Sequence, residues 1–296
     1  CKLASNLEHL IIMAFLPFTL NIKGSIRLIE RPQIMGIVNA TPDSFFPGSR
    51  TLSRESIIER TRAMIDQGAD MIDIGAYSSR PGAADVSETE ELRRLETALE
   101  AIRSVNTDIP VSVDTFRANV ARTAISSLGA DIVNDISGGS LDADMLETVA
   151  FLKCPYILMH MRGTPSTMQT LTDYDDVTAD VIKELSIILS RLEALGVSDI
   201  IVDPGFGFAK TVEQNYELMR NLEIMENLLG LPLLVGISRK SMLTRPLGIK
   251  PDEALNATTV MNVIALSKGA SILRVHDVKE ARQALVLTGL VTKQYS

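Results

Sequence analysis

Two basic side chains near the C-terminus have the spacing of an anion-binding site. Arg274 and His276 are separated by one residue in an apolar run, so on a strand both project to the same side. A forked guanidinium and an imidazole on one face suit a phosphate or diphosphate group. Lys240, just after another apolar run, adds a third positive charge. The alternative is a structural ion pair between strands, for example from this pair to Asp277.

Three acidic or amide residues end apolar runs in the middle of the chain. Asp114 ends Val-Ser-Val-Asp, Asn134 ends Ile-Val-Asn, and Asp203 ends Ile-Ile-Val-Asp. A buried carboxylate is costly unless donors meet it, and a heterocycle with an amidine-like pair of N–H groups would provide two hydrogen bonds. Asn134 can donate and accept on the same ring. These residues predict a heterocycle-binding pocket; the alternative is that they cap loops by bonding backbone amides.

Three further polar residues have less specific surroundings. Asn39 ends an apolar run, and its amide oxygen suits Mg²⁺ bound together with phosphate oxygens, because this ion takes few ligands from protein. Arg80 lies in a loop with Pro and Gly that could close over the same anion. His160 follows an apolar run, where a lone histidine is more often a hydrogen-bonded core residue. The sequence contains no nucleophile–base triad pattern, glycine-rich phosphate loop or dinucleotide fingerprint.

Eight short apolar runs, each ending on or holding a polar residue, would position these groups. Strands repeated with crossover helices imply a parallel sheet, and eight such units predict an α/β fold with a single closed (β/α)8 TIM barrel. The carboxyl ends of the strands form the active face of such a barrel. The expected strands are Gln33–Asn39, Asp70–Gly75, Pro110–Asp114, Asp131–Asp135, Tyr156–His160, Ile200–Asp203, Leu233–Ser238 and Ser271–Asp277.

An N-terminal β-hairpin and eight helices complete the predicted fold. Two alternating segments, Phe18–Arg27 and Ile26–Arg31, surround Lys23-Gly24 and predict a hairpin that plugs the bottom of the barrel. Ser53 and Ser87 are expected to be N-caps, the latter in a capping box with Glu90. Pro246 is expected to break the segment after the seventh strand. The expected helices are Ser56–Gln67, Glu88–Val105, Ala118–Leu128, Ala143–Leu152, Ala179–Leu195, Val212–Leu229, Glu253–Lys268 and Val278–Gln294.

The composition narrows the classes of partner. The chain has 296 residues and a formal net charge of −8, which argues against nucleic acid or an anionic membrane surface but not against a small anion in one cleft. Cys1 and Cys154 form no disulfide scaffold or zinc motif, so a cytoplasmic location fits best. The apolar run Leu10–Phe18 is too short to cross a bilayer. We expect residues 1–17 to be a tag or a disordered or irregular segment, and residues 18–296 to form one barrel domain.

Nine motifs together resemble the dihydropteroate synthase family, the pterin-binding TIM-barrel enzymes of folate biosynthesis that sulfonamides inhibit. They occur in the family's order, and their number makes chance agreement negligible. They are Met35-Gly-Ile-Val-Asn-Ala-Thr-Pro-Asp-Ser-Phe45, Asp73-Ile-Gly75, Ser78-Ser-Arg-Pro-Gly82, Ser112-Val-Asp-Thr115, Asn134-Asp-Ile-Ser-Gly138, Leu158-Met-His-Met161, Asp203-Pro-Gly-Phe-Gly-Phe208, Gly236-Ile-Ser-Arg-Lys240 and Arg274-Val-His-Asp277.

The resemblance implies a reaction, in which p-aminobenzoate attacks the methylene carbon of 6-hydroxymethyl-7,8-dihydropterin diphosphate to give 7,8-dihydropteroate and pyrophosphate. It also implies Mg²⁺ as cofactor and a homodimer. The catalytic residues would be Asn39, Arg80, Lys240, Arg274 and His276. By substrate, the resemblance assigns the pterin to Asp114, Asn134, Asp203 and Lys240; the diphosphate to Asn39, Arg80, Arg274 and His276, with the metal at Asn39; and p-aminobenzoate to Phe45, Ser79, Pro81, Phe208, Ser238 and Arg239.

Two positions depart from the family pattern, and other functions stay open. Pro47 and Tyr77 each stand where a family loop usually carries an acidic residue. A pterin-binding methyltransferase acting on methyltetrahydrofolate would share the carboxylates but would not need Arg80 or the pair Arg274 and His276. A non-catalytic pterin-binding paralogue would be consistent with the altered first loop. An aldolase with a Schiff base on Lys240 would leave the other strand-end groups unexplained.

Overall fold

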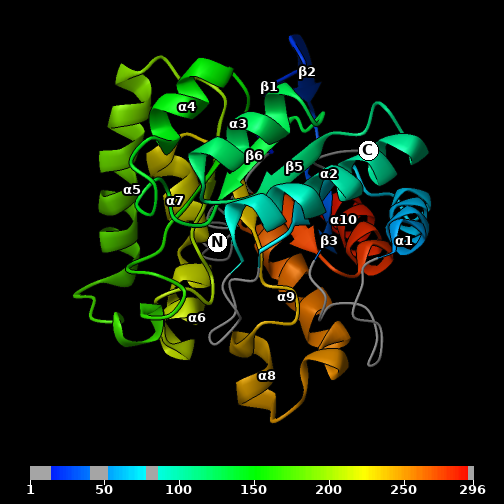
Figure 1. The fold of residues 1–296 in the computed structure, drawn as a ribbon. Helices are drawn as coiled ribbons and strands as arrows, with labels where there is room; N and C mark the ends of the chain where they lie inside the picture. Colours follow the sequence, from blue (N-terminus) through cyan, green and yellow to red (C-terminus); the bar gives the residue numbers. More distant parts are fainter. Residues whose placement is uncertain (1–14, 41–52, 78–85, 293–296) are drawn as a thin grey trace, which may run out of the picture.

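The predicted apolar runs form the strands of one closed barrel. The computed structural model describes residues 15–40, 53–77 and 86–292, and in them eight parallel strands close in the order β10-β3-β4-β5-β6-β7-β8-β9. Helices connect the strands and surround them (Figure 1), which confirms the predicted (β/α)8 barrel. The strands are β3 Gln33–Asn39, β4 Met71–Gly75, β5 Val111–Asp114, β6 Ile132–Asp135, β7 Tyr156–Met159, β8 Ile200–Asp203, β9 Leu233–Val235 and β10 Ala270–Val275.

The last two barrel strands are shorter at their carboxyl ends than the sequence predicts. After β9 the chain turns, because the N–H of Lys240 donates to the carbonyl of Ile237 at 3.1 Å and Arg239 has a positive φ of 59°. Ser238 therefore lies on a turn and not on a strand. His276 likewise follows the end of β10. Both residues still lie at the carboxyl end of the barrel, where the site was expected.

The helices agree with the sequence pattern except near α6 to α8. Ser53 and Ser87 are side-chain N-caps as predicted, but Glu90 pairs with Arg93 and Arg94 and completes no capping box. The helices are α1 Arg54–Asp66, α2 Glu88–Val105, α3 Ala118–Ser126, α4 Met145–Leu152, α5 Val177–Ala194, α6 Val212–Arg220, α7 Leu222–Leu229, α8 Ser241–Leu247, α9 Leu255–Ser267 and α10 Val278–Thr292.

The prediction of one helix over Val212–Leu229 is wrong, because the helix breaks at Asn221. That residue has φ −101° and ψ 11°, and its side chain donates to Thr178 Oγ1 of α5 at 3.0 Å. The prediction that Pro246 breaks the next segment also needs correction. Pro246 lies in the last turn of α8, where the carbonyl of Met242 accepts instead from the Tyr216 hydroxyl at 3.0 Å.

The N-terminal hairpin closes the bottom of the barrel, as predicted. Strands β1 (Phe18–Ile22) and β2 (Ser25–Ile29) pair antiparallel around a turn in which Lys23 and Gly24 have positive φ. In Figure 1 the hairpin lies at the end of the barrel opposite to α8. The buried side chains of β1 pack on the first inward residues of the barrel strands, in one cluster of Leu20, Ile22, Met35, Met71, Ile132, Ile157, Ile201, Leu234 and Ile272.

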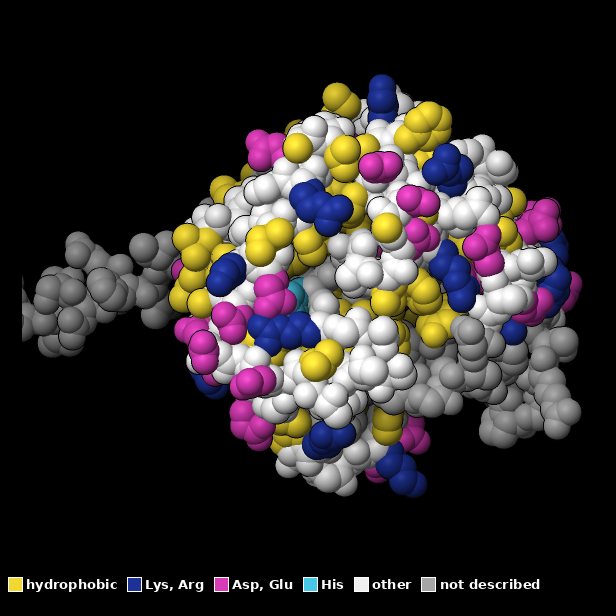
Figure 2. Space-filling model, turned by 60° about the vertical axis from the view of Figure 1, so that its left-hand side comes forward, with side chains coloured by type: hydrophobic (Ala, Val, Ile, Leu, Met, Phe, Trp, Pro, Cys, Tyr) yellow, Lys and Arg dark blue, Asp and Glu magenta, His cyan; other side chains and the backbone are white. Residues whose placement is uncertain are grey.

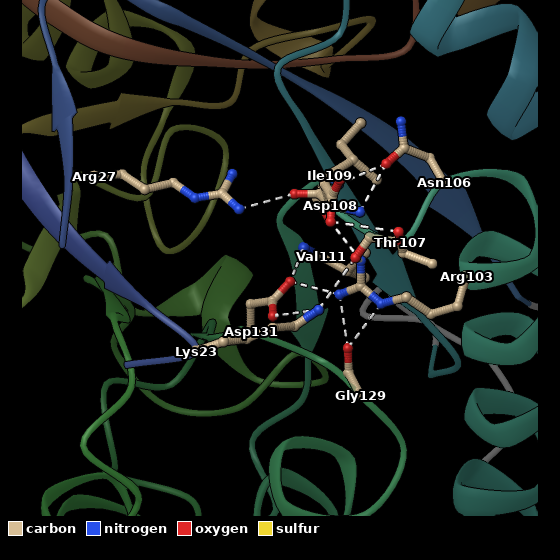
Figure 3. A network of polar contacts seen from close by, with 10 residues as sticks. All are labelled: Lys23, Arg27, Arg103, Asn106, Thr107, Asp108, Ile109, Val111, Gly129 and Asp131. Carbon is tan, nitrogen blue, oxygen red and sulfur yellow. Dashed lines mark hydrogen bonds and ion pairs between the residues drawn. The ribbon is translucent and has the colours of Figure 1, made fainter. Parts of the chain in front are cut away.

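A network of polar contacts fixes the hairpin to the barrel (Figure 3). Asp131, before β6, lies 3.4 Å from Lys23 Nζ and 2.5 Å from Arg103 Nη2 of α2. The same carboxylate accepts from the N–H of Val111 at 2.8 Å. Arg27 of β2 donates to the carbonyl of Asp108 at 3.1 Å. One buried carboxylate thus connects the hairpin, a helix and two strands.

Strand alternation places a second layer above this apolar one. Side chains two residues apart on a strand point to the same face, so each inward residue of the bottom layer has a partner nearer the carboxyl end. Most of those partners are polar or are glycine. Because the strands are parallel, these partners all lie toward the carboxyl end of the barrel. By this alternation the upper layer contains Ile37, Asp73, Asn134, Met159, Asp203 and Arg274, and Gly236 follows directly after β9.

The surface of the described residues is mixed in charge. Figure 2 shows acidic and basic side chains interspersed over one face of the molecule, without a broad basic area on that face. Among the described residues, no helix is long and apolar enough to span a lipid bilayer.

Candidate active site

Arg274 joins two carboxylates at the centre of the upper layer. Its Nη2 lies 2.6 Å from Asp73 Oδ2 and 2.9 Å from Asp114 Oδ2, and its Nε donates to Asp73 at 2.7 Å. Asn134 Nδ2 donates to the other oxygen of Asp73 at 3.3 Å. Strands β10, β4, β5 and β6 thus supply one connected group. Arg274 thus forms an ion pair between strands, as the structural alternative in the sequence analysis expected. Its partners are Asp73 and Asp114 and not Asp277.

Burial controls the charges in this group. It raises the pKa of Asp114 to about 7; the neighbouring Asp73 carboxylate adds to the rise, whereas Arg274 opposes it. Burial alone would lower the pKa of Arg274, but the two carboxylates outweigh it and raise that pKa. The guanidinium therefore stays charged. Among the described residues, no acceptor contacts its Nη1, which leaves one edge of the fork for a ligand.

Asp203 and Lys240 meet the same group around Gly236. A Cβ at Gly236 would make ordinary van der Waals contacts, 3.8 Å from Asp203 Oδ2, 3.8 Å from Lys240 Nζ and 3.9 Å from Arg274 Cβ, so these three side chains converge on one point. Burial raises the pKa of Asp203, with the Lys240 ammonium opposing it. Burial lowers the pKa of Lys240 to about 8, although Asp203 pulls it up. Of the four residues predicted to hold the pterin, all lie here, with Asn134 reaching them through Asp73.

His276 is neutral and is oriented by Ser238. The Ser238 hydroxyl accepts from the backbone N–H of His276 at 3.3 Å and lies 2.9 Å from its Nδ1. The hydroxyl oxygen has a second lone pair and a proton, so it can pair with Nδ1 in either tautomer of the ring. Burial lowers the pKa of His276 to about 4, and the Arg274 charge contributes. The imidazole is thus uncharged at neutral pH, with Nδ1 on Ser238 and Nε2 as its other hydrogen-bonding atom.

Arg239 forms a fork with Asp277, through Nε at 3.0 Å and Nη2 at 2.6 Å. Its guanidinium is therefore already satisfied in part. Ser238 and Arg239, predicted to contact p-aminobenzoate, have their present side-chain partners in His276 and Asp277.

An apolar wall lies beside the charged groups. Phe208, predicted for p-aminobenzoate, packs on a buried cluster of Ile136, Met159, Met161, Met168 and Ala209, together with Phe116 and Leu141. Lys240 Nζ lies 4.7 Å from the centre of the Phe208 ring, an arrangement typical of a cation–π contact. Tyr77, which departs from the family pattern, packs edge-on against Phe116 with ring centres 5.0 Å apart. That tyrosine therefore extends the wall.

Asn39 lies at the end of β3, where it pairs in register with Gly75 of β4, and Gly75 in turn pairs with Asp114 of β5. The amide is therefore two strands away from a member of the central group. Among the described residues, no cluster of three or more His, Cys, Asp or Glu side chains has the arrangement of a metal site. Four predicted site residues, together with Pro47, lie outside the described residues: Phe45, Ser79, Arg80 and Pro81.

Asp73 is the central residue that the sequence analysis left out of its site. It lies inside β4, and the sequence analysis quoted it in the motif Asp73-Ile-Gly75 without giving it a role. The two-residue alternation of the strand was the signal that would have found it, because Met71 and Asp73 face the same side. His160, in contrast, is a hydrogen-bonded core residue, as expected from its apolar surroundings; its partners are Glu184 and Lys210.

Known proteins share this sequence and architecture. The family model of pterin binding enzymes matches residues 35–276. The chain is 46% identical over 257 residues to the dihydropteroate synthase of Synechocystis sp., which covers 86% of this chain and 88% of that relative. It is 42% identical over 259 residues to the enzyme of Escherichia coli, covering 87% and 90%. The chain belongs to the dihydropteroate synthase family.

Solved structures of family members agree in fold. A dihydropteroate synthase of Yersinia pestis in a sulfonamide drug complex matches with a TM-score of 0.87 at 38% identity, covering 93% of this chain and all of that chain. A dihydropteroate synthase of Xanthomonas albilineans in complex with 7,8-dihydropteroate matches with a TM-score of 0.82 at 34% identity, covering 93% and 98%.

Proposed function

We propose that this chain catalyses the dihydropteroate synthase reaction, the transfer of the dihydropterin methylene group from its diphosphate to the amine of p-aminobenzoate. Membership of the family supports this function. The observation that carries it is one connected group at the carboxyl end of the barrel. Asp203 and Lys240 meet Arg274 around Gly236, and Arg274 in turn pairs with two carboxylates, one of which accepts from Asn134. The pterin ring needs carboxylates that accept from its N–H groups, and the anionic leaving group needs positive charge. The site offers both side by side.

The carboxylates suit the pterin ring. Asp203 already accepts from the N–H of Gly205 through Oδ1 at 2.7 Å, so Oδ2 is the oxygen that faces Lys240 and a ligand. Asp114 Oδ2 accepts from Arg274, so Oδ1 is the oxygen that remains for the ligand. A ring with neighbouring N–H groups would satisfy these buried oxygens. Asn134 and Lys240 would complete the set as donors to ring acceptors.

The diphosphate would bind where donors remain. Nη1 of Arg274 and Nε2 of His276 are the atoms that the contacts above leave for phosphate oxygens, His276 in the tautomer with its proton on Nε2, and Asn39 and Arg80 complete the proposed set. Neutralising the charge that develops on the leaving oxygen lowers the barrier to breaking the C–O bond. The bonding electron pair leaves with pyrophosphate, the amine nitrogen forms the new C–N bond, and the ammonium so formed loses its proton to water.

No strong base is required for this sequence. If the C–O bond breaks first, the electron-rich dihydropterin stabilises the cation, and the weakly basic aryl amine needs only to be positioned. The wall that contains Phe208 suits the aryl ring, with Ser238 and Arg239 at its edge. Phe45, Ser79 and Pro81 belong to the same proposed pocket. For Arg239 to bind a carboxylate of the substrate, it must share its fork with Asp277.

The residues fit a magnesium ion whose ligands come mainly from the substrate phosphates and water. Asn39 offers one neutral amide oxygen, and a hard ion that takes phosphate oxygens and water needs few protein ligands. When bound, the ion would neutralise charge on the leaving diphosphate. We further propose a cytoplasmic homodimer, supported by the low cysteine content and by an exposed apolar face on α9 and α10.

A pyrophosphate-release assay tests the function. We expect release from the dihydropterin diphosphate to depend on p-aminobenzoate, with one pyrophosphate for each dihydropteroate formed. Release without the amine, or no release, would contradict the proposal; binding of the pterin without release would indicate a non-catalytic paralogue. Asp203→Asn should weaken pterin binding by about 1.5–3 kcal/mol, because a charge-assisted hydrogen bond is lost. An unchanged affinity would make Asp203 structural.

A further inference from the structure

A buried lysine outside the proposed substrate sets holds the loop that follows β8. Lys210 is only 5% exposed. Its Nζ donates to the carbonyls of Gly205 and Phe208, both at 3.1 Å, and lies 3.0 Å from His160 Nδ1. An ammonium has three N–H donors, and three acceptors surround this one. Each N–H of the ammonium thus has an acceptor, while burial lowers the pKa of Lys210 to about 7, with the Asp203 carboxylate opposing the fall.

His160, one of the three acceptors around Lys210, is itself held by further contacts. Since His160 Nδ1 accepts from Lys210, the ring carries its proton on Nε2, which lies 3.0 Å from Glu184 Oε2 of α5. Arg162 donates to the same carboxylate at 3.0 Å, so Glu184 stays ionised; its hydrogen bond with His160 is the main reason that its pKa falls to about 2. A chain of contacts thus runs from α5 through His160 to Lys210 and the loop.

The loop has a backbone that needs such support. Gly205, Gly207 and Ala209 have φ values of 73°, 81° and 48°, and a non-glycine residue rarely adopts a positive φ. A Cβ at Gly205 would lie 1.9 Å from the carbonyl oxygen of His160. The loop therefore lies directly against the end of β7, with no room for a side chain at that point.

Two lysines bind the carbonyls of this loop, one at its own end and one from the segment after β9. Lys210 takes the carbonyls of Gly205 and Phe208, whereas Lys240 donates to the carbonyl of Phe206 at 2.6 Å. Residues of the proposed site lie at both ends of the same loop. Asp203 accepts from the N–H of Gly205, and the Phe208 ring lies 4.7 Å from Lys240 Nζ.

We propose that Lys210 is a positioning residue, whose ammonium, held by His160 and Glu184, fixes the 203–210 loop so that Asp203, Lys240 and Phe208 are aligned for substrate. This inference rests on the proposed function for the identity of the substrates. It assigns a role in binding to a side chain that has no access to the substrates itself. The contacts predict that losing the ammonium disturbs the pterin and p-aminobenzoate contacts together.

The first test is Lys210→Met, which keeps the length of the side chain and removes the donors. We expect KM for both substrates to rise by about tenfold to hundredfold, since charge-assisted hydrogen bonds are lost. Affinity for 6-hydroxymethylpterin, measured by fluorescence titration, should fall by a similar factor. Lys268→Met is the matched control, because Lys268 also donates to a backbone carbonyl, that of Arg220, but on an exposed surface. It should leave both measurements unchanged.

Chemical rescue separates positioning from stability. Lys210→Ala leaves space for a small cation, and propylammonium should restore kcat/KM in a saturable manner, whereas 1-propanol, of similar size but neutral, should not. If Lys210→Met does not fold, His160→Phe decides instead, because it removes the acceptor and keeps a ring; the same rise in KM is expected. Folding is checked by circular dichroism.

Three results would overturn the proposal: unchanged KM values in folded Lys210→Met, a loss of thermal stability with unchanged kinetic constants per folded molecule, or equal rescue by propanol and propylammonium. Failure of the proposed function is distinguishable from these. In that case the unsubstituted chain would release no pyrophosphate, while the titration with 6-hydroxymethylpterin would still compare Lys210→Met with its control.

Discussion

At the scale of single residues, Arg274 has two roles that mutation can separate. It neutralises Asp73 and Asp114, and its Nη1, which has no acceptor among the described residues, is the proposed donor to the diphosphate. Removing one partner of a buried ion pair leaves uncompensated charge and typically costs about 3–5 kcal/mol. We therefore predict that Arg274→Met lowers the free energy of unfolding by about that amount, as measured by urea denaturation, and weakens both pterin binding and use of the diphosphate.

A second substitution gives the control for this prediction. In the double variant Asp73→Leu with Arg274→Met, one of the two carboxylates is gone along with the cation, so part of the lost stability should return. Activity should not return, because Nη1 of Arg274 is still missing. Recovery of activity in the double variant would show that the arginine is only structural.

The pH dependence of kcat/KM follows from two buried groups. Burial places the pKa of Asp114 at about 7 and that of Lys240 at about 8. If the pterin needs the carboxylate and the ammonium, binding is lost as pH falls below the first value and as pH rises above the second. We predict a narrow bell-shaped profile of kcat/KM, which reports the free enzyme.

Variants assign the two limbs of that profile. Asp114→Asn has no group to titrate and should remove the acid limb at a lower plateau. Lys240→Arg keeps its charge to higher pH and should shift upward the part of the basic limb that Lys240 sets, while Lys210, with a pKa lowered by burial to about 7, still contributes to that limb. A value of kcat/KM that stays constant from about pH 6 to about pH 9 would show that the titrations of Asp114 and Lys240 do not control binding.

The site could be predicted in part because its residues are at or near strand ends. Asp114, Asn134 and Asp203 each follow β-branched or apolar residues in short runs, and the topology of a barrel gathers such positions at one face. Asp73 was quoted in a motif but received no role, because its partner Arg274 lies 201 residues away and the pairing exists only in space. Lys210 was not selected because it lies on a loop and its partners, among them Glu184 on α5, are close only in space.

At the scale of elements, the sequence predicted strands better than helix ends. Apolar runs that are buried on both faces read clearly as barrel strands, and serine N-caps marked the starts of α1 and α2. The break at Asn221 depends on a hydrogen bond to Thr178 of α5, a contact between helices far apart in sequence. The local sequence pattern contains no information on contacts between distant helices, so it predicted α6 and α7 as one helix.

The hairpin offers a direct test of packing at this scale. Leu20 and Ile22 are buried against the bottom layer of the barrel, and truncation of a buried leucine to alanine typically costs about 2.7–5 kcal/mol. We predict this loss of unfolding free energy for Leu20→Ala, measured by urea denaturation. Ile26→Ala is the control, since Ile26 of β2 is 78% exposed and should change stability by less than about 0.5 kcal/mol.

The active end should be insensitive to that change. The hairpin contacts the layer that contains Met71 and Ile132, one layer below Asp73 and Asn134. Leu20→Ala should therefore leave kcat/KM per folded molecule unchanged at a temperature where the variant is fully folded. A large fall in kcat/KM in that folded state would mean that the bottom layer sets the geometry of the site.

At the scale of the whole molecule, the net charge of −8 coexists with an exposed apolar face. Exposed apolar side chains occur on α9 and at successive turns of α10, and the two helices pack on each other. Contiguous apolar patches on a protein surface usually mark an interface. The side chains of this face are Val260, Val263, Val286, Leu287, Leu290 and Val291.

We predict that this face joins two copies of the chain and that a charge in its middle separates them. Leu290 is 66% exposed, so Leu290→Asp should not disturb the monomer fold, whereas two desolvated carboxylates at a symmetric interface would be unfavourable. Sedimentation equilibrium should show a dimer for the unsubstituted chain and a monomer for Leu290→Asp. Leu228→Asp on α7, at a residue that is 68% exposed, should remain a dimer. A monomeric unsubstituted chain, or a dimeric Leu290→Asp, would assign this face another partner.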